Sequence, residues 1–287
     1  MEEDSVTKIG LVTDSTAYFP PEILQRYDIR VGHQVLIWGK EEFEDGVDIT
    51  PDAFYTRLKS AAVMPTTTQV TIASFQKIFA PLVAEGTPIL AILLSTKLSG
   101  TIQSAVQAKE MFPGATIEIV DSEATAMAMG FQVLEAARAA EEGRSFAEVV
   151  EIAHKAKNHT GVLFVVDTLE FLHRGGRIGG AAKLFGTALN LKPLLELQDG
   201  RIAALERVRT KAKATARLLD VLEERIGGRK PVRIAALHAS APEEARQLLA
   251  QAEKRFQPVE SMLAAVSPVV GNHTGPGTIG ICYSVGV

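Results

Sequence analysis

The chain has 287 residues, of which 46% are hydrophobic and 22% are charged, and its formal net charge is −4. This length and apolar content predict a globular protein with a substantial core, built as one large domain or two ordinary ones. The acidic balance argues against a general nucleic-acid-binding protein, so we expect no nucleic acid among its partners.

The first half of the chain alternates between predicted strands and helices. Apolar runs that end at polar residues predict strands at residues 8–15, 88–95, 116–122 and 161–168, with helical spacing between them. Residues 31–49 form an extended excursion with a turn near Gly39-Lys40. Strands separated by helices indicate parallel βαβ units. We therefore predict a layered α/β domain with a mainly parallel sheet at residues 1–160.

The second half has a different pattern. Residues 191–210 contain two extended runs joined by Asp199-Gly200, which predicts a β-hairpin. A helix, a strand at residues 231–239, a helix from Glu243 and a final strand at residues 278–285 follow. These elements predict a mixed α+β domain at residues 161–287. Because no Gly/Ser linker separates the halves, we expect them to pack together with a ligand between them.

Two segments rich in hydroxyl groups precede predicted helices. The loop PTTTQVT contains Thr67 and Thr68, and it serves either as a simple N-cap or as an anion cradle. The segment LLSTKLSGTIQSA contains Ser95, Thr96 and the pair Ser99-Gly100, directly after a buried strand. The carboxyl ends of parallel strands form the usual ligand edge of such a sheet. A capping serine without a ligand is the alternative for this segment.

Arg177 lies between two pairs of glycines in the segment TLEFLHRGGRIGG. Backbone without Cβ on both sides of a permanent charge suggests that the chain approaches an anion, and a guanidinium suits a carboxylate or phosphate. A structural arginine that ties two domains together is the alternative. His273 falls in a predicted glycine-rich loop before the last strand, where it is either a ligand-binding or a structural histidine.

Several chemistries lack their motifs. Cys282 is the single cysteine, and no His-Glu-x-x-His is present, so we expect no metal site. There is no P-loop. A serine hydrolase built from Ser99 and His273, with Asp14 or Asp167 as the orienting acid, lacks the Gly-x-Ser-x-Gly elbow. No apolar run is long enough for a membrane helix, and the acidic N-terminus differs from a signal peptide. We therefore expect a cytoplasmic protein without an integral membrane segment.

Taken in order, six segments resemble the bacterial DegV family, whose characterised members are the fatty-acid-binding subunits of fatty acid kinase. The match runs from about Lys8 to Tyr283. The segments are VTDSTA, PTTTQVT, LSTKLSGTIQSA, DTLEFLHRGGRIG, LKPLLELQDGRI and HTGPGTIG. Each segment alone is a weak signal, whereas six in the same order are highly specific.

The resemblance implies a protein that holds a long-chain fatty acid between two domains, with the carboxylate near the mouth and the tail in an apolar tunnel. It implies no cofactor and one macromolecular partner, an ATP-dependent kinase subunit that phosphorylates the bound acid. The positions that match the family's carboxylate site are Thr67, Ser99, Arg177 and His273. Possible secondary contributors are Thr68, Ser95, Thr96 and Gly100.

The hydroxyl loop departs from the family pattern. The usual Thr-Ser-Gln-Pro-Ser is replaced by Thr67-Thr68-Gln69-Val70-Thr71, and the usual Ser-Ser before lysine is Ser95-Thr96. Both changes keep the hydroxyl chemistry but leave the shape of the pocket, and so the acyl preference, open. A serine-type acyl hydrolase and a carrier of another anionic amphiphile stay open as alternatives.

Overall fold

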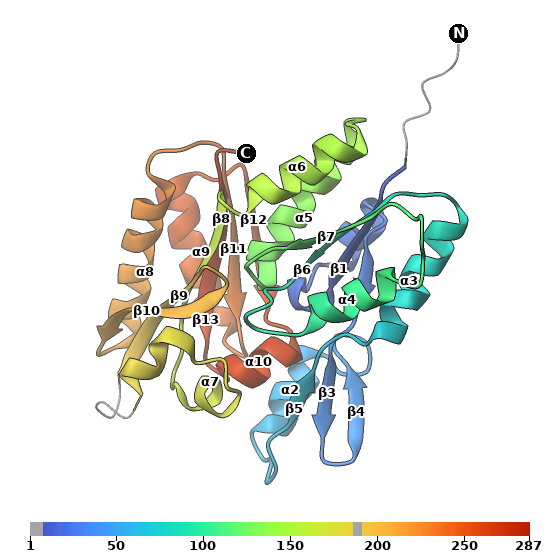
Figure 1. The fold of residues 1–287 in the computed structure, drawn as a ribbon. Helices are drawn as coiled ribbons and strands as arrows, with labels where there is room; N and C mark the ends of the chain where they lie inside the picture. Colours follow the sequence, from blue (N-terminus) through green and yellow to red (C-terminus); the bar gives the residue numbers. More distant parts are fainter. Residues whose placement is uncertain (1–7, 186–190) are drawn as a thin grey trace.

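The computed structural model describes residues 8–185 and 191–287 and shows an α/β fold with three sheets (Figure 1). A four-stranded sheet and a six-stranded sheet lie beside each other, and a three-stranded sheet lies at one end of the molecule. The predicted architecture, a mainly parallel sheet packed against a mixed α+β half, is confirmed. Within the described residues, no helix has the length and apolar character needed to cross a membrane.

The four-stranded sheet is entirely parallel, in the order β2-β1-β6-β7. All residues of its two central strands are buried, as expected for a parallel sheet with both faces covered. Helices α3 and α4 pack on one face and bury Phe75 and Phe79. The elements are β1 (Gly10–Asp14), the 3₁₀ turn η1 (Ser15–Ala17), α1 (Pro21–Arg26), β2 (Arg30–Gly32), α3 (Ile72–Ala84), β6 (Ile89–Leu93), α4 (Thr101–Lys109) and β7 (Ile117–Asp121).

Most of the predicted excursion at residues 31–49 forms a hairpin of β3 and β4, although Val31 and Gly32 belong to β2 of the parallel sheet. β5 extends the hairpin into an antiparallel sheet in the order β4-β3-β5. Its hairpin turns at Gly39-Lys40, where Gly39 has a φ of 67°. The elements are β3 (Val35–Trp38), β4 (Glu41–Glu44), α2 (Pro51–Leu58) and β5 (Thr66–Thr68). The prediction of a loop at residues 65–71 is wrong for Thr66–Thr68, which pair with β3. Threonine is β-branched and favours extended backbone, so a polar run of this kind can form a strand.

The six-stranded sheet is mixed, in the order β10-β9-β8-β13-β11-β12. Its strands are β8 (Thr160–Val165), β9 (Lys192–Gln198), β10 (Arg201–Val208), β11 (Val232–His238), β12 (Glu260–Ala265) and β13 (Ile279–Val285). Only β11 and β12 are parallel neighbours, and the last strand of the chain lies in the middle of the sheet. Helices α8 (Lys211–Ile226) and α9 (Pro242–Phe256) cover its outer face. The sequence analysis missed β12, an edge strand whose residues are mostly half-buried.

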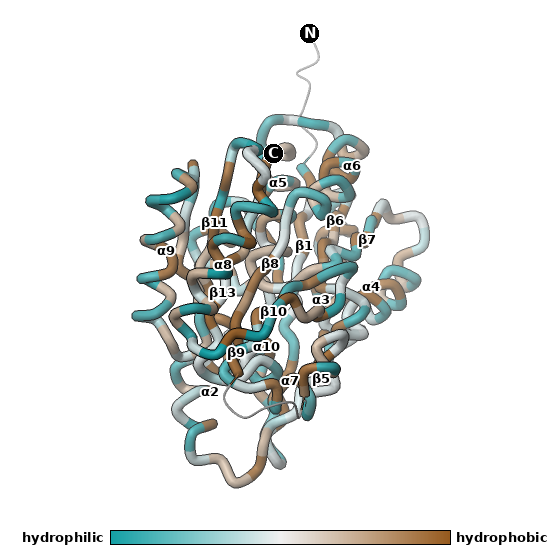
Figure 2. The backbone as a smooth tube through the Cα atoms, turned by 90° about the vertical axis from the view of Figure 1, so that its left-hand side faces the viewer, coloured by the Kyte–Doolittle hydropathy of each residue, from teal (hydrophilic) through white to brown (hydrophobic). Residues whose placement is uncertain are grey.

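Helix α5 (Ala126–Glu141) lies between the two large sheets and contacts β6 of one and β8 and β13 of the other. Its sequence AMAMGFQVLEAARAAE is rich in small residues, which allow close packing on both sides. A Cβ on Gly130 would lie 2.8 Å from the Met127 sulfur and 3.2 Å from Phe19. Helix α6 (Phe146–Ala156) covers α5, and its capping box joins Ser145 and Glu148. Figure 2 shows the hydrophobic strands inside and hydrophilic residues on the outer helices.

Candidate ligand-binding site

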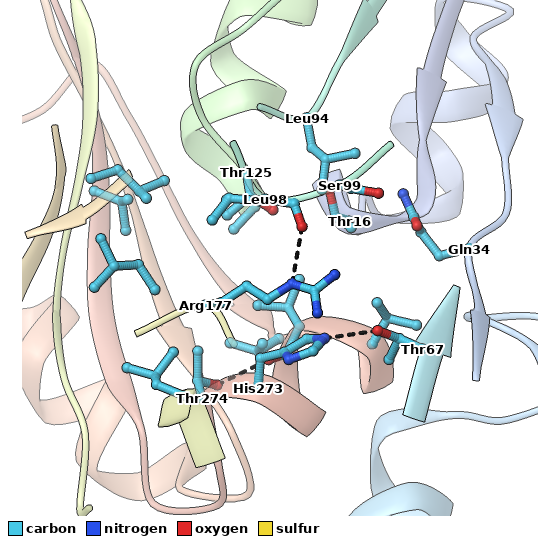
Figure 3. Close-up of a pocket in the computed structure, with 18 of the residues that line it drawn as sticks. Thr16, Gln34, Thr67, Leu94, Leu98, Ser99, Thr125, Arg177, His273 and Thr274 are labelled. Carbon is cyan, nitrogen blue, oxygen red and sulfur yellow. Dashed lines mark hydrogen bonds between the residues drawn. The ribbon is translucent and has the colours of Figure 1, made fainter. Parts of the chain in front are cut away.

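A cavity lies between the two large sheets and encloses about 940 Å³, including its opening to solvent (Figure 3). Most of its wall is apolar and comes from β8, β9, β10, β11 and the helix α10 (Pro268–Thr274). The apolar lining residues are Leu94, Leu98, Val162, Phe164, Leu172, Leu197, Ile202, Leu237, Val266, Val269 and Val270. Such a wall suits an extended hydrocarbon chain.

All four predicted carboxylate-binding residues line this cavity. Thr67 comes from β5, Ser99 lies just before α4, Arg177 follows α7 (Glu170–Arg174), and His273 belongs to α10. These segments are far apart in sequence, so the fold brings together the group that the resemblance selected. A second hollow of about 620 Å³, lined also by Met64, Pro65 and Arg174, shares three of the four. Thr67, Arg177 and His273 therefore border both hollows.

His273 lies in a helix, and the prediction of a glycine-rich loop is wrong at this position. Ser267 caps α10, and Pro268 is its first residue. Gly271 is required for packing, because a Cβ there would lie 2.0 Å from the Tyr55 hydroxyl oxygen. The buried carboxylate of Asp45 accepts a hydrogen bond from the Val269 N–H at 3.1 Å, which holds the start of this helix against the small sheet.

The imidazole of His273 and the hydroxyl of Thr67 form a hydrogen bond, with 2.8 Å between Nε2 and Oγ1. Burial, with a smaller effect of the Arg177 charge, lowers the pKa of His273 to about 4, so the ring is neutral near pH 7. Its Nδ1 is buried and has no partner in the described part of the chain. Because an unpaired N–H costs more than an unused lone pair, we infer that Nε2 carries the proton and donates to Thr67. The Thr67 hydroxyl then has its own proton available for an anion.

The glycines beside Arg177 allow close packing with other parts of the chain, whereas the sequence suggested that they allow the backbone to approach an anion. A Cβ on Gly175 would lie 2.0 Å from His273 Nδ1, so the imidazole occupies that space. A Cβ on Gly179, where φ is 51°, would lie 2.5 Å from the Ile202 carbonyl oxygen of β10. The glycines therefore allow the loop to pack tightly against α10 and β10, which fixes the position of Arg177.

Arg177 is a half-buried cation that is bonded to backbone oxygens. Its Nε donates to the Leu98 carbonyl at 3.0 Å, and its Nη1 donates to the Gly175 carbonyl at 2.6 Å. Burial lowers its pKa, yet a guanidinium stays charged at neutral pH. No carboxylate of the described residues lies within ion-pair distance of it, although most arginines on the surface have one. A buried charge needs a partner, so the site favours an anion here.

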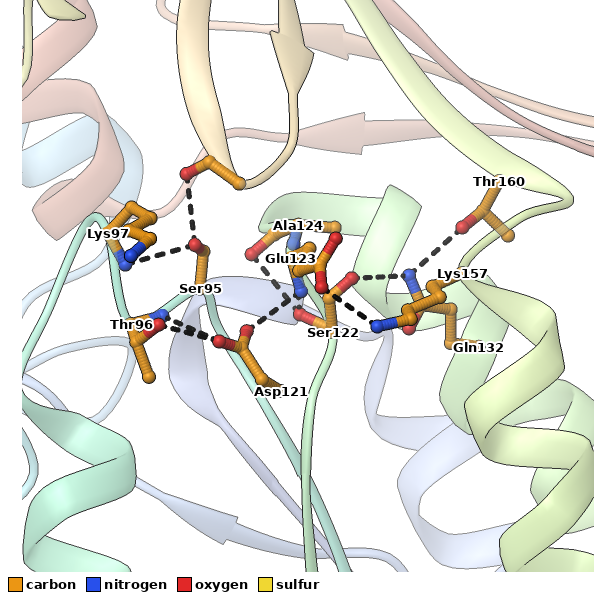
Figure 4. A network of polar contacts seen from close by, with 11 residues as sticks. Ser95, Thr96, Lys97, Asp121, Ser122, Glu123, Ala124, Gln132, Lys157 and Thr160 are labelled. Carbon is orange, nitrogen blue, oxygen red and sulfur yellow. Dashed lines mark hydrogen bonds and ion pairs between the residues drawn. The ribbon is translucent and has the colours of Figure 1, made fainter.

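The possible secondary residues are placed differently. Thr68 lines the cavity, whereas Ser95, Thr96 and Gly100 do not. Ser95 donates to the Gly200 carbonyl at 2.9 Å, and Thr96 donates to Asp121 at 2.6 Å. Figure 4 shows Ser95, Thr96 and Asp121 within this polar network. Gly200 forms the β9–β10 turn, so Ser95 links the parallel sheet to the six-stranded one. Gly100 is the N-cap of α4.

Sequence reasoning missed several polar residues of the cavity, among them Gln34 and Thr125. Gln34 is 2% exposed and lies just before β3, and its Nε2 donates to Thr101 Oγ1 at 2.9 Å. Thr125 precedes α5, and its buried Oγ1 has no partner among the described residues. The rule that ligands bind beyond the carboxyl ends of parallel strands would have found Thr125 after β7. No local pattern distinguishes Gln34.

The observed hydrogen bonds do not link Ser99, His273 and an aspartate into the catalytic triad that a serine hydrolase requires. His273 Nε2 pairs with Thr67, and the Ser99 hydroxyl pairs with Thr101 at 3.0 Å. Asp14 accepts from the Leu94 N–H and from Thr16, and Asp167 pairs with Lys192. The described residues also contain no group of three or more His, Cys, Asp or Glu side chains that is suited to a metal ion.

The fold and the cavity define a class: α/β proteins with an apolar cavity between two sheets and a half-buried arginine among the residues that line it. A family model described as an uncharacterised protein of the DegV family matches residues 8–285. The chain belongs to the DegV family, as the six segments predicted.

Relatives of known sequence and structure cover nearly the whole chain. A DegV domain-containing protein of Streptomyces coelicolor is 38% identical over 278 residues, which cover 96% of this chain and 98% of that protein. A DegV family protein from Thermus thermophilus, whose structure is described as showing fatty acid binding, matches with a TM-score of 0.90 at 35% identity and covers 97% of this chain and 99% of its own. DegV of Bacillus subtilis, described as a fatty acid binding protein, matches with a TM-score of 0.89 at 30% identity and the same coverage.

Proposed function

We propose that this protein binds a long-chain fatty acid, with the tail along the apolar wall and the carboxylate beside Arg177. The observation that carries the proposal is the guanidinium of Arg177, which is half-buried near the end of an apolar cavity without a carboxylate partner among the described residues. Thr67 and Ser99 add hydroxyl groups at the same end. Two structural relatives described as fatty acid binding proteins support the same ligand class.

The two ends of the cavity have different energetic roles. Burying about fifteen methylenes at roughly 0.8 kcal/mol each contributes on the order of 12 kcal/mol before the costs of association. A hydrogen bond to a charged group contributes about 1.5–3 kcal/mol. The tail therefore supplies most of the affinity, and the polar residues position the carboxylate.

We further propose that the protein acts in the cytoplasm and presents the carboxylate to a separate ATP-dependent kinase subunit for acyl phosphate formation. The second hollow supports this role, because Thr67, Arg177 and His273 border both it and the cavity. A carboxylate held by these three residues is reachable from outside while the tail stays buried. Arg177 would stabilise the negative charge that develops during phosphoryl transfer.

Denaturing extraction of the purified protein followed by mass spectrometry tests the ligand. We expect near-stoichiometric fatty acid, and the spectrum also reports chain length and unsaturation. A blank that persists after incubation with several long-chain acids would refute fatty acid binding, and a different anionic amphiphile would replace it as the ligand. Turnover of acyl esters by the protein alone, abolished in Ser99→Ala, would favour the hydrolase.

The kinase step has a separate test. The loaded protein, a candidate kinase subunit and ATP should give an acyl phosphate that hydroxylamine traps as a hydroxamate. Arg177→Ala should lower this yield more than it lowers the lipid content. Normal phosphorylation of a normally loaded Arg177→Ala variant would show that Arg177 has no part in the step.

A further inference from the structure

Two buried residues, Gln34 and Thr101, form a chain of hydrogen bonds that ends at Ser99, and Gln34 also lines the cavity. Gln34 Nε2 donates to Thr101 Oγ1 at 2.9 Å, and Thr101 Oγ1 lies 3.0 Å from Ser99 Oγ. Gln34 is 2% exposed and Thr101 is fully buried. In Figure 3, Gln34 and Ser99 lie on the same side of the cavity, across from His273.

The orientation of the Gln34 amide follows from its surroundings. The fully buried carboxylate of Asp14 accepts hydrogen bonds from the Thr16 hydroxyl, the Thr16 N–H and the Leu94 N–H. Burial raises the pKa of Asp14, whereas these donors and the Gln34 side chain lower it. A carboxylate surrounded by donors attracts an NH₂ group and repels an amide oxygen. The NH₂ group of Gln34 therefore faces both Asp14 and Thr101.

The direction of the next two hydroxyl groups follows by counting donors and acceptors. An NH₂ group only donates, so Thr101 Oγ1 accepts from Gln34. Among the contacts of the described residues, Ser99 Oγ is the one acceptor within reach of the Thr101 proton. Because a buried hydroxyl proton without an acceptor is costly, Thr101 donates to Ser99. Ser99 then accepts from Thr101 and keeps its own proton for the cavity.

We propose that Gln34 and Thr101 are positioning residues that fix Ser99 as a hydrogen-bond donor to the carboxylate of the ligand. The proposal rests on the proposed function, since it concerns how the same site selects an anion. Neither residue needs to touch the ligand for this role. The relay orients the Ser99 hydroxyl toward the ligand, just as the imidazole of His273 orients the hydroxyl of Thr67.

A double-mutant cycle between Gln34→Glu and Ser99→Ala tests the relay. The introduced carboxyl group would share one proton with the adjacent Asp14, and its other oxygen would accept from Thr101. Thr101 would then accept from Ser99, and the Ser99 proton would turn away from the ligand. The dissociation constants of oleate and oleyl alcohol are measured by calorimetry on delipidated protein, and their ratio is compared. A general loss of structure lowers the affinity for both ligands, whereas reversal of the Ser99 hydroxyl lowers mainly the affinity for oleate.

Gln34→Glu should weaken the binding of oleate relative to oleyl alcohol. We expect this loss to be about tenfold larger when Ser99 is present than in the Ser99→Ala background. Direct repulsion by the new carboxylate acts in both backgrounds and cancels in the cycle. Gln132→Glu is the matched control, because Gln132 is 1% exposed and its Nε2 donates to Thr160 Oγ1 at 2.9 Å outside the cavity. It should leave the ratio unchanged.

Equal effects of Gln34→Glu in both backgrounds would overturn the relay and leave fatty acid binding intact. If the wild-type protein binds neither oleate nor dodecyl sulfate, the proposed function fails, and the relay fails with it. Should Gln34→Glu not fold, the cycle is run with Thr101→Val, which is neutral and close in shape. There we expect a coupling with Ser99→Ala of about threefold, and an additive result would overturn the relay.

Discussion

Replacing Gly175 by alanine should weaken fatty acid binding, because the new Cβ would displace the imidazole of His273. The backbone at Gly175 has φ −72° and ψ −8°, which alanine adopts without strain. The new Cβ would lie 2.0 Å from His273 Nδ1, whereas ordinary contacts begin at 3.4 Å, so the two atoms must separate by 1.4 Å (3.4 − 2.0). A movement of that size breaks the 2.8 Å hydrogen bond between His273 and Thr67.

The magnitude follows from the hydrogen bond that is lost. Without the imidazole donor, the Thr67 hydroxyl is no longer oriented toward the ligand, and a hydrogen bond to a charged group is worth about 1.5–3 kcal/mol. We therefore expect calorimetry to show a fatty acid affinity about 10- to 100-fold weaker. Overpacking should also lower the free energy of unfolding by about 1–3 kcal/mol.

Gly176→Ala is the matched control. Gly176 has a φ of 71°, and no atom lies within 4 Å of the position that a Cβ would take, so alanine there strains the backbone without contacting His273. It should lower stability and leave the affinity unchanged. NMR titration gives a second readout, because a displaced His273 should lose its low pKa of about 4 and titrate closer to 6.5. A Gly175→Ala variant with wild-type affinity and an unchanged His273 titration would refute the reasoning.

Two predictions concern pH and one concerns the contact between the sheets. The pKa of His273 is lowered from 6.5 to about 4, so the free energy of unfolding should fall by about 3 kcal/mol as pH drops from 6.5 to 4. Denaturant titrations of His273→Gln should not show this fall. Burial raises the pKa of Asp45 from 3.8 to about 6, so the contribution of Asp45 to the free energy of unfolding has the opposite sign and increases as pH falls from 6 to 3.8. The same titrations of Asp45→Asn should not show this increase. Gly200→Ala places a Cβ 2.3 Å from Ser95 Oγ and should lower the melting temperature more than Gly86→Ala, which has a similar φ and open space; equal losses would contradict the packing argument.

The sequence predicts the buried part of the fold well because apolar runs report burial on both faces. Such runs predict the strands β1, β6, β8 and β13, and nearly all residues of these strands are buried. The same signal fails where a strand is polar or at an edge. β5 consists of three threonines, and β12 lies at the edge of its sheet, so their pairing depends on neighbours that no local pattern reveals.

The glycines near the site show a second limit of sequence reasoning. A glycine pair beside Arg177 suggests an approach to an anion, and the glycines around His273 suggest a loop. In the structure, Gly175 makes room for His273 and Gly271 makes room for Tyr55. A missing Cβ reports a close approach, but the approaching atom is set by the tertiary fold.

If the protein binds a fatty acid as proposed, the direction of the hydroxyl protons would set the selectivity of the site. Thr67 receives a hydrogen bond from neutral His273, and Ser99 receives one from Thr101 in the proposed relay, so both hydroxyls have protons to donate beside the Arg177 guanidinium. A carboxylate accepts from all three and has no proton of its own to place. The hydroxyl of an alcohol carries no charge, so it leaves the charge of Arg177 unpaired. In the proposed function, selection of acids over alcohols with the same tail would therefore depend on His273 and Gln34, the two residues that orient the donors.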